Sequence, residues 1–222
     1  RSVPDTTPDD MKVIIASPTG GPENLRLATR PLPKMKSEEV LIKVSAAGVN
    51  GADIRERQGK YPVPPGAPDI MGLEVSGEIV AVGRGCRRFA VGDHVCALLI
   101  GGGYAEYAVA PEGQCMAAPK NVSLIESAGI PEIFCTVWAN MIDRCALKAG
   151  DTVLIQGGTS GIGYAGIKLA KAFQATVFAT ARTEEKCAAM RRFGAHHVIN
   201  YREQIFDDAV SYTHLRAHET LL

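Results

Sequence analysis

Residues 153–166, VLIQGGTSGIGYAG, join an apolar run to a glycine-rich turn. The run 153–156 predicts a buried strand, and apolar residues then recur at helical spacing as far as Phe173. A second strand is predicted at 176–180. Because strand, helix and strand alternate, this stretch indicates a parallel βαβ unit, and a flexible glycine turn between unrelated elements is the weaker interpretation.

The turn contains the spacing G-x-G-x-x-G at Gly161, Gly163 and Gly166. In this motif the first glycine permits a tight turn, the second leaves room for a pyrophosphate, and the third allows the helix to approach the strand. The helix start also presents unpaired N–H groups and the positive end of its dipole. We therefore expect Gly161, Ile162 and Gly163 to bind a dinucleotide.

The residues after the second strand favour one dinucleotide over the other. A site for NAD usually carries an acidic residue about 20 positions beyond the motif, where it binds the ribose 2′-hydroxyl. Here that place holds Arg182 and Thr183, with Lys186 one helical turn later. These cations suit a 2′-phosphate, so NADPH is predicted over NADH. Glu184 and Glu185 are interpreted as first-turn acids of a helix capped by Thr183.

The composition is that of an ordinary globular protein with one large or two small domains. The chain has 222 residues, of which 46% are hydrophobic and 22% charged, and no net charge. The charge balance argues against nucleic acid as a partner, and no apolar run reaches the roughly 18 residues of a membrane span. Six cysteines without a C-x-x-C pair and the lack of a signal peptide predict a cytoplasmic protein.

Short apolar runs separated by glycines predict a small, partly closed β-barrel over residues 11–120. Its expected strands are 11–15, 40–44, 75–82, 94–99 and 104–109. Residues 1–10 are expected to be a disordered leader.

The segment 121–210 is predicted to be a partial doubly wound sheet. Ser123 and Glu126 have capping-box spacing, and 132–145 predicts a long helix before the glycine motif. Three strands are expected, near 153–156, 176–180 and 197–200, where the complete arrangement has six. Because 211–222 shows no period that continues this pattern, we interpret it as a non-native tail on a C-terminally truncated chain.

The ordered motifs of residues 11–210 resemble the zinc-independent quinone oxidoreductases of the medium-chain dehydrogenase/reductase superfamily. Besides the glycine turn, they are 20–25 (GGPENL), 47–62 (AGVNGADIRERQGKYP), 72–74 (GLE), 92–95 (GDHV), 101–107 (GGGYAEY) and 199–201 (INY). The resemblance implies a GroES-like catalytic domain at 11–120 beside an incomplete Rossmann domain that binds NADPH. It also implies a quinone or enone substrate and a homodimeric parent protein.

The resemblance implies a role for individual residues. Asn50 and Tyr61 would be the catalytic residues on the substrate side of the nicotinamide, and Thr136 would lie near its carboxamide. Ser160 would lie in the phosphate turn, and Lys186 with Tyr201 would meet the 2′-phosphate. An amide and a phenol can donate hydrogen bonds to a developing oxyanion without a metal.

No metal is expected. Zinc-using relatives have a cysteine and a histidine where this chain has Asn50 and Leu73, and leucine cannot coordinate zinc. Glu74 is interpreted as a structural or supporting carboxylate rather than a ligand. The weaker interpretations of Asn50 as a turn former and of Tyr61 as a loop aromatic stay open.

The function predicted for the parent protein is NADPH-dependent hydride transfer to quinones, whether or not the truncated chain is itself active. One alternative is an enoyl-thioester or enone reductase of the same superfamily, which shares the Asn-x-x-Asp stretch at Asn50 and the tyrosine at Tyr61. Such reductases often carry asparagine where this chain has Leu73, and this favours quinones. The other alternative is a non-catalytic, crystallin-like protein that binds NADPH.

Overall fold

The structure is a computed structural model that describes residues 7–203 and 220–221. The chain divides into two compact units, Arg1–Glu132 and Ile133–Leu222. The first is built on antiparallel strands and the second on parallel strands, so each is described by itself. This is the predicted fold class, an α/β protein with a barrel-type antiparallel sheet and an incomplete doubly wound sheet, and it is confirmed.

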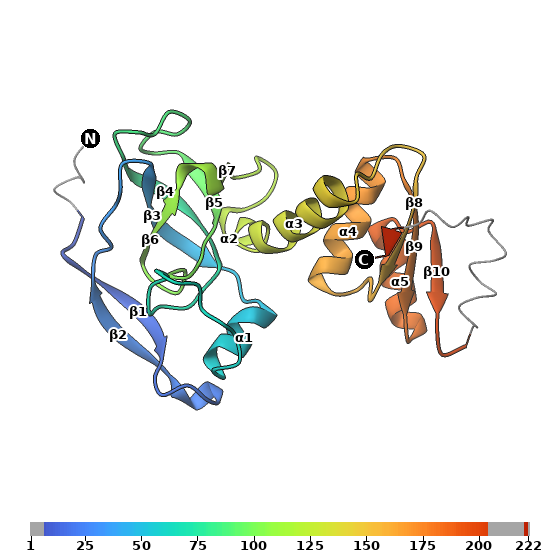
Figure 1. Ribbon diagram of the computed structural model, residues 1–222, viewed down its shortest axis with the longest axis horizontal. Helices are drawn as coiled ribbons and strands as arrows, with labels where there is room; N and C mark the ends of the chain where they lie inside the picture. Colours follow the sequence, from blue (N-terminus) through green and yellow to red (C-terminus); the bar gives the residue numbers. More distant parts are fainter. Residues whose placement is uncertain (1–6, 204–219, 222) are drawn as a thin grey trace. The chain divides into compact units, whose positions relative to one another are not determined.

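The first unit contains a curled five-stranded antiparallel sheet in the order β6-β3-β4-β5-β7. Its strands are β3 (Glu39–Ala47), β4 (Glu74–Val82), β5 (His94–Leu98), β6 (Tyr107–Pro111) and β7 (Cys115–Ala117). Alternate residues point inward, and Val40, Ile42, Val75 and Ile79 are fully buried between the strands. A separate antiparallel pair, β1 (Asp10–Ala16) and β2 (Leu25–Pro31), lies beside it in Figure 1.

Short helices lie between or after these strands in the chain. They are η1 (Pro22–Asn24), α1 (Gly51–Arg57), η2 (Glu112–Gln114) and α2 (Leu124–Ser127). The predicted capping box is confirmed at α2, where Glu126 N–H donates to Ser123 Oγ at 3.2 Å. Because α2 packs against β3 and β4, the division between units follows Glu132, whereas the sequence-based boundary lies between 120 and 121.

The second unit contains a parallel sheet in the order β10-β9-β8-β11. The strands are β8 (Thr152–Gln156), β9 (Thr176–Ala181), β10 (His197–Asn200) and β11 (Thr220–Leu221). Figure 1 shows α4 (Gly161–Ala172) and α5 (Glu184–Phe193) beside these strands. The buried face of α4 packs on β8 and β9, which gives this unit its hydrophobic core.

The structure differs from the expectation in a few elements. The helix expected at 132–145 is an α-helix, α3 (Pro131–Val137), followed by a π-helical segment, η3 (Trp138–Arg144). β2 was not predicted because most of its side chains are exposed and show no apolar alternation. α1 and β7 were also missed. β11 adds a fourth strand to the three that the sequence indicates.

The predictions for the two ends of the chain concern residues that the structure describes only in part. Residues 1–6 of the expected leader lie outside the described residues, and Asp10 already belongs to β1. Of the expected non-native tail, 211–219 and 222 lie outside the described residues as well. Within the described ranges, no helix has both the length and the apolar character that a membrane crossing requires.

Candidate functional site

The glycine turn connects the end of β8 to the start of α4. Gly157 follows the last residue of β8 and has φ 66°, in the left-handed region that favours glycine. A Cβ at Gly163 would lie 2.5 Å from Gly157 O, so this residue must also be glycine for the turn to close. The tight turn is therefore made at Gly157 and not at Gly161, as the motif alone predicted, because Gly161 is already the first residue of α4.

Ser160 fixes the start of α4. Its hydroxyl donates to Gly157 O and accepts from Gly163 N–H, both at 3.0 Å. Tyr164 N–H donates to Ser160 O at 2.8 Å. The N–H groups of Gly161 and Ile162 precede these bonds, have no partner within the helix, and belong to exposed residues. The turn thus offers two free donors at the positive end of a 12-residue helix.

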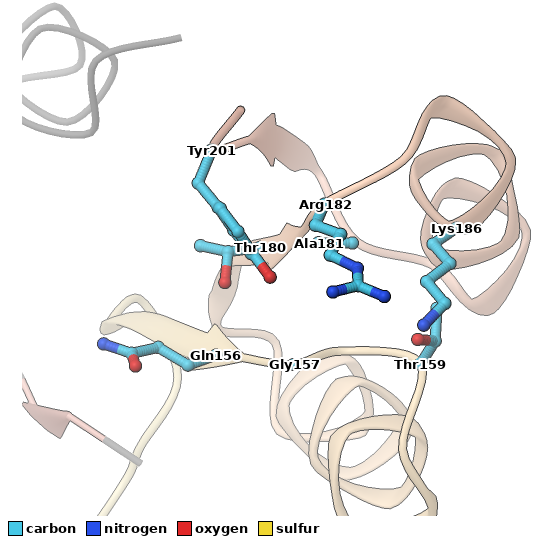
Figure 2. A pocket seen from close by; sticks show the side chains of 8 residues that line it. All are labelled: Gln156, Gly157, Thr159, Thr180, Ala181, Arg182, Lys186 and Tyr201. Carbon is cyan, nitrogen blue, oxygen red and sulfur yellow. The ribbon is translucent and has the colours of Figure 1, made fainter. Parts of the chain in front are cut away.

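A cavity of about 630 Å³ opens next to this turn. Its lining residues come from the carboxyl ends of β8 and β9, the turn, the first part of α5 and the position after β10: Gln156, Gly157, Thr159, Thr180, Ala181, Arg182, Lys186 and Tyr201. Figure 2 shows the long side chains of Arg182 and Lys186 extending into the space between these segments. Ligands of open parallel sheets bind at this edge of the strands.

The cavity is positively charged. Arg182 and Lys186 line it, and among the described residues none of the lining side chains is acidic. The predicted cap of α5 is confirmed, since Thr183 Oγ1 accepts from Lys186 N–H at 3.4 Å. Glu184 pairs with Arg191 at 2.6 Å along the same helix. Neither Glu184 nor Glu185 lines the cavity, and Glu184 is paired with Arg191.

The structure brings together three of the residues predicted to bind cofactor, Arg182, Lys186 and Tyr201. Ser160, Gly161, Ile162 and Gly163 form the adjoining turn and helix start. Thr136 does not line this cavity. It lies in α3, where its carbonyl accepts from Asn140 Nδ2 at 2.8 Å.

Sequence reasoning missed Thr159 and Thr180 as lining residues. A usable signal existed, because Thr180 is the last residue of the predicted strand 176–180 and Thr159 lies inside the glycine turn. Positions at the carboxyl ends of parallel strands are the expected ligand-contacting positions.

The first unit places Asn50 against a buried carboxylate. Asn50 is the N-cap of α1, and its backbone N–H donates to Asp53 Oδ2 at 2.7 Å. Its side-chain Nδ2 donates to Glu74 Oε1 at 2.8 Å, while Glu74 Oε2 accepts from Glu132 N–H at 2.8 Å. Asn50 is thus the N-cap of a helix that the sequence did not predict, and its amide is also held by a side chain from β4.

Several acidic side chains gather around this contact. Burial raises the pKa of Glu74, and the hydrogen bonds from Glu132 and Asn50 oppose that rise. Burial also raises the pKa of Glu56 and Glu132, and nearby carboxylates add to both shifts. The surroundings of Asn50 are therefore rich in carboxylates, in contrast to the cationic cavity of the second unit.

Tyr61 lies in the loop that follows α1 and is partly exposed. The pairing of Tyr61 with Asn50 at one site stays a prediction. Leu73 is buried immediately before Glu74. In the part of the chain that the structure describes, no group of three or more His, Cys, Asp or Glu side chains could hold a metal ion.

The chain matches two known sequence families. Residues 36–120 match the family described as alcohol dehydrogenase GroES-like domain, and residues 161–217 match the family described as zinc-binding dehydrogenase. The chain is 37% identical over 202 residues to a quinone oxidoreductase of Lama guanicoe, a match that covers 90% of this chain and 61% of that protein. The chain therefore spans less than two thirds of the length of this relative.

Solved structures of oxidoreductases are also similar to this chain. A quinone oxidoreductase from Coxiella burnetii is 31% identical with a TM-score of 0.77, over 90% of this chain and 65% of that one. An NAD-dependent alcohol dehydrogenase is 32% identical with a TM-score of 0.80, over 92% of this chain and 67% of that one. Sequence and structure together show that the chain belongs to the medium-chain dehydrogenase/reductase superfamily, a family of oxidoreductases that use a nicotinamide cofactor.

Proposed function

We propose that this chain carries the cofactor-binding and acceptor-binding residues of an NADPH-dependent quinone reductase. The observation that carries the proposal is the cavity at the carboxyl ends of β8 and β9, which combines a glycine turn with two cations. The likeness to quinone oxidoreductases from Lama guanicoe and Coxiella burnetii supports the acceptor class.

The residues present fit a phosphorylated dinucleotide. Because Gly163 has no Cβ, the turn can close against the start of α4. There Gly161 and Ile162 would donate N–H bonds to the diphosphate. Arg182 and Lys186 would hold the 2′-phosphate, with the phenol of Tyr201 as a further donor. This set favours NADPH over NADH, because a bare ribose hydroxyl gives two cations no anion to pair with.

On the acceptor side, we assign roles to Asn50 and Tyr61. When bound, the cofactor would supply a hydride, which carries two electrons, to the quinone. The Asn50 amide would donate a hydrogen bond to a quinone oxygen as negative charge develops there. Tyr61, or water, would give the proton that completes the hydroquinone, and Thr136 would contact the nicotinamide carboxamide. None of these roles requires a metal.

Turnover measurements test this proposal against its two alternatives. We expect NADPH to reduce a naphthoquinone in the presence of the protein, faster than NADH does and faster than either reduces a crotonyl thioester. A strong preference for the thioester would favour an enoyl reductase. NADPH binding by calorimetry without reduction of any quinone, enone or thioester would favour a binding protein. Absence of NADPH binding would refute all three.

Two further properties belong to the proposal. The parent protein is expected to be a homodimer, which size-exclusion chromatography with light scattering measures directly. It is also expected in the cytoplasm, which a fluorescent fusion of the intact protein would test.

A further inference from the structure

The amide of Asn50 is fixed by a residue far away in the sequence. Asn50 Nδ2 donates to Glu74 Oε1 at 2.8 Å, although the two residues are 24 positions apart. A primary amide has two N–H donors and a carbonyl acceptor. One N–H of Asn50 is therefore committed to Glu74, and the second remains for another partner.

Glu74 is itself held at both carboxylate oxygens. Its side chain is at the start of β4, and the residue is only 2% exposed. Glu74 Oε2 accepts from Glu132 N–H at 2.8 Å, and the backbone oxygen of Glu74 accepts from Gly48 N–H at 3.2 Å. A Cβ at Gly48 would lie 2.0 Å from Glu74 Oε1, so the carboxylate occupies the place that a side chain at position 48 would take.

This arrangement determines which way the Asn50 amide faces. If the amide turned over, its carbonyl oxygen would meet the carboxylate, and two acceptors would repel each other in a buried place. The charged acceptor also makes a stronger hydrogen bond than a neutral one. The amide therefore keeps one N–H on Glu74, which leaves the direction of the other N–H fixed as well.

We propose that Glu74 is a positioning residue: by holding one N–H of Asn50, it presents the other to the oxygen of the hydride acceptor. The inference rests on the proposed function, in which Asn50 is the catalytic donor. Glu74 acts only through Asn50 and does not itself touch the acceptor. The position of the Glu74 carboxylate also explains why residue 48, before Val49 and Asn50, is glycine: any larger residue there would displace the carboxylate.

A double-mutant cycle on quinone reduction tests the proposal. Glu74→Gln keeps the shape of the side chain, but its single oxygen cannot serve both Asn50 and Glu132 N–H. We expect this change to lower kcat about 10- to 100-fold, the scale of a misplaced catalytic group, without changing the Kd for NADPH. Asn50→Ala should lower kcat at least as much, and the double variant should be no slower than Asn50→Ala alone.

The matched control is Glu78→Gln, which changes an exposed carboxylate on the same strand. It should leave kcat at the wild-type value. The proposal is wrong if Glu74→Gln leaves kcat unchanged, or if its effect multiplies with that of Asn50→Ala, because Glu74 would then act independently of the amide.

A second measurement does not depend on activity. In protein labelled with ¹⁵N-asparagine, the side-chain amide signal of Asn50 is the one lost in Asn50→Ala. Glu74→Gln should shift this signal and speed its hydrogen exchange, whereas Glu78→Gln should do neither. An unmoved signal in folded Glu74→Gln would overturn the proposal. A shifted signal in a protein that reduces no quinone would support the contact and refute the proposed function.

Discussion

The candidate sites of the two units carry opposite charges. One is formed by residues on consecutive elements, and the other by contacts between residues far apart in the sequence. In the second unit, the cavity is cationic and is lined by residues at the ends of successive strands, from Gln156 to Tyr201. In the first unit, Asn50 lies among carboxylates that come from α1, β4 and the start of α3. A site for a polyanionic ligand needs local N–H donors and cations, which consecutive elements of one parallel sheet can supply. A site that aims a single neutral amide needs fixed long-range partners.

This difference predicts how each unit responds to substitution. The second unit should lose ligand affinity when its turn or its cations change. The first unit should lose catalytic rate, or change its pH dependence, while NADPH binding is preserved.

The largest effect is expected at Gly163 in the second unit. In Gly163→Ala the new Cβ would lie 2.5 Å from Gly157 O, which is backbone that cannot give way without opening the turn. We expect a loss of about 1 to 3 kcal/mol in unfolding free energy, as for other overpacked sites, and loss of NADPH binding. Chemical denaturation and calorimetry measure the two.

The control for this change is Gly113→Ala in the first unit, where a new Cβ meets nothing within 4 Å. It should leave both stability and NADPH affinity nearly unchanged. If Gly163→Ala behaved in the same way, the close approach at the glycine turn would not matter for the ligand.

The next effect separates the two nicotinamide cofactors. Lys186→Glu replaces a cation of the cavity by an anion that repels a 2′-phosphate. The affinity for NADPH should fall about 10- to 100-fold, the scale of a lost hydrogen bond to a charged group, and that for NADH much less. Fluorescence titration with both cofactors measures this. Lys168→Glu, on the exposed side of α4 over the Tyr164 ring, is the matched control. Equal losses for NADPH and NADH would contradict the role of Lys186.

A smaller effect is expected when the helix caps of the two units are replaced. Ser160 caps α4 and Ser123 caps α2, each by accepting an N–H of the first turn. Replacement of either by Ala should cost about 1 kcal/mol of unfolding free energy. Only Ser160→Ala should also weaken NADPH, because this hydroxyl shapes the glycine turn. Thermal unfolding followed by NADPH titration checks both variants, and an equal loss of affinity in Ser123→Ala would be inconsistent with separate sites.

The smallest effect is the pH dependence of the first unit. The raised pKa values of Glu74, Glu56 and Glu132 favour the folded state below the ordinary value of 4.5, and this contribution is lost as the pH rises through the raised values. The lowered pKa values of Glu112 and Glu126 contribute above 4.5, and this is lost as the pH falls through the lowered values. The combined contribution of these five groups to the stability of the first unit is therefore expected to be greatest near pH 4.5.

Calorimetric unfolding between about pH 2 and 8 measures this dependence. Glu74→Gln should flatten the slope above pH 4.5, since it removes one shifted group and the repulsion it exerts on Glu132. The slope below 4.5 should persist, because Glu112 still accepts N–H bonds from Arg87, Arg88 and Phe89. An unchanged slope above 4.5 would show that Glu74 is not ionised differently in the folded state.

The sequence was most informative where the responsible interactions are local. The strands 153–156 and 176–180, the cap at Thr183 and the cations at 182 and 186 lie close together in the sequence, from β8 to the first turn of α5, so period and spacing suffice to predict them. The same reasoning placed the tight turn at Gly161, because a motif gives spacing and not the φ angle that identifies Gly157. It missed β2, whose residues are mostly exposed. It also missed that η3, the segment after α3, is π-helical, because no apolar period distinguishes a π-helix from an α-helix.

The amino-acid sequence by itself determined the alternation of elements in the second unit, the glycine spacing and the positive charge of its cavity, because hydrophobic period and residue type act over short stretches of chain. Only the tertiary structure decided that Glu74 holds the Asn50 amide and that Glu132 N–H holds Glu74. Those contacts join residues 24 and 58 positions apart. The first contact exists because β3 pairs with β4, Ala47 opposite Val75, which brings the start of β4 next to Gly48 and Asn50. No local pattern encodes that pairing.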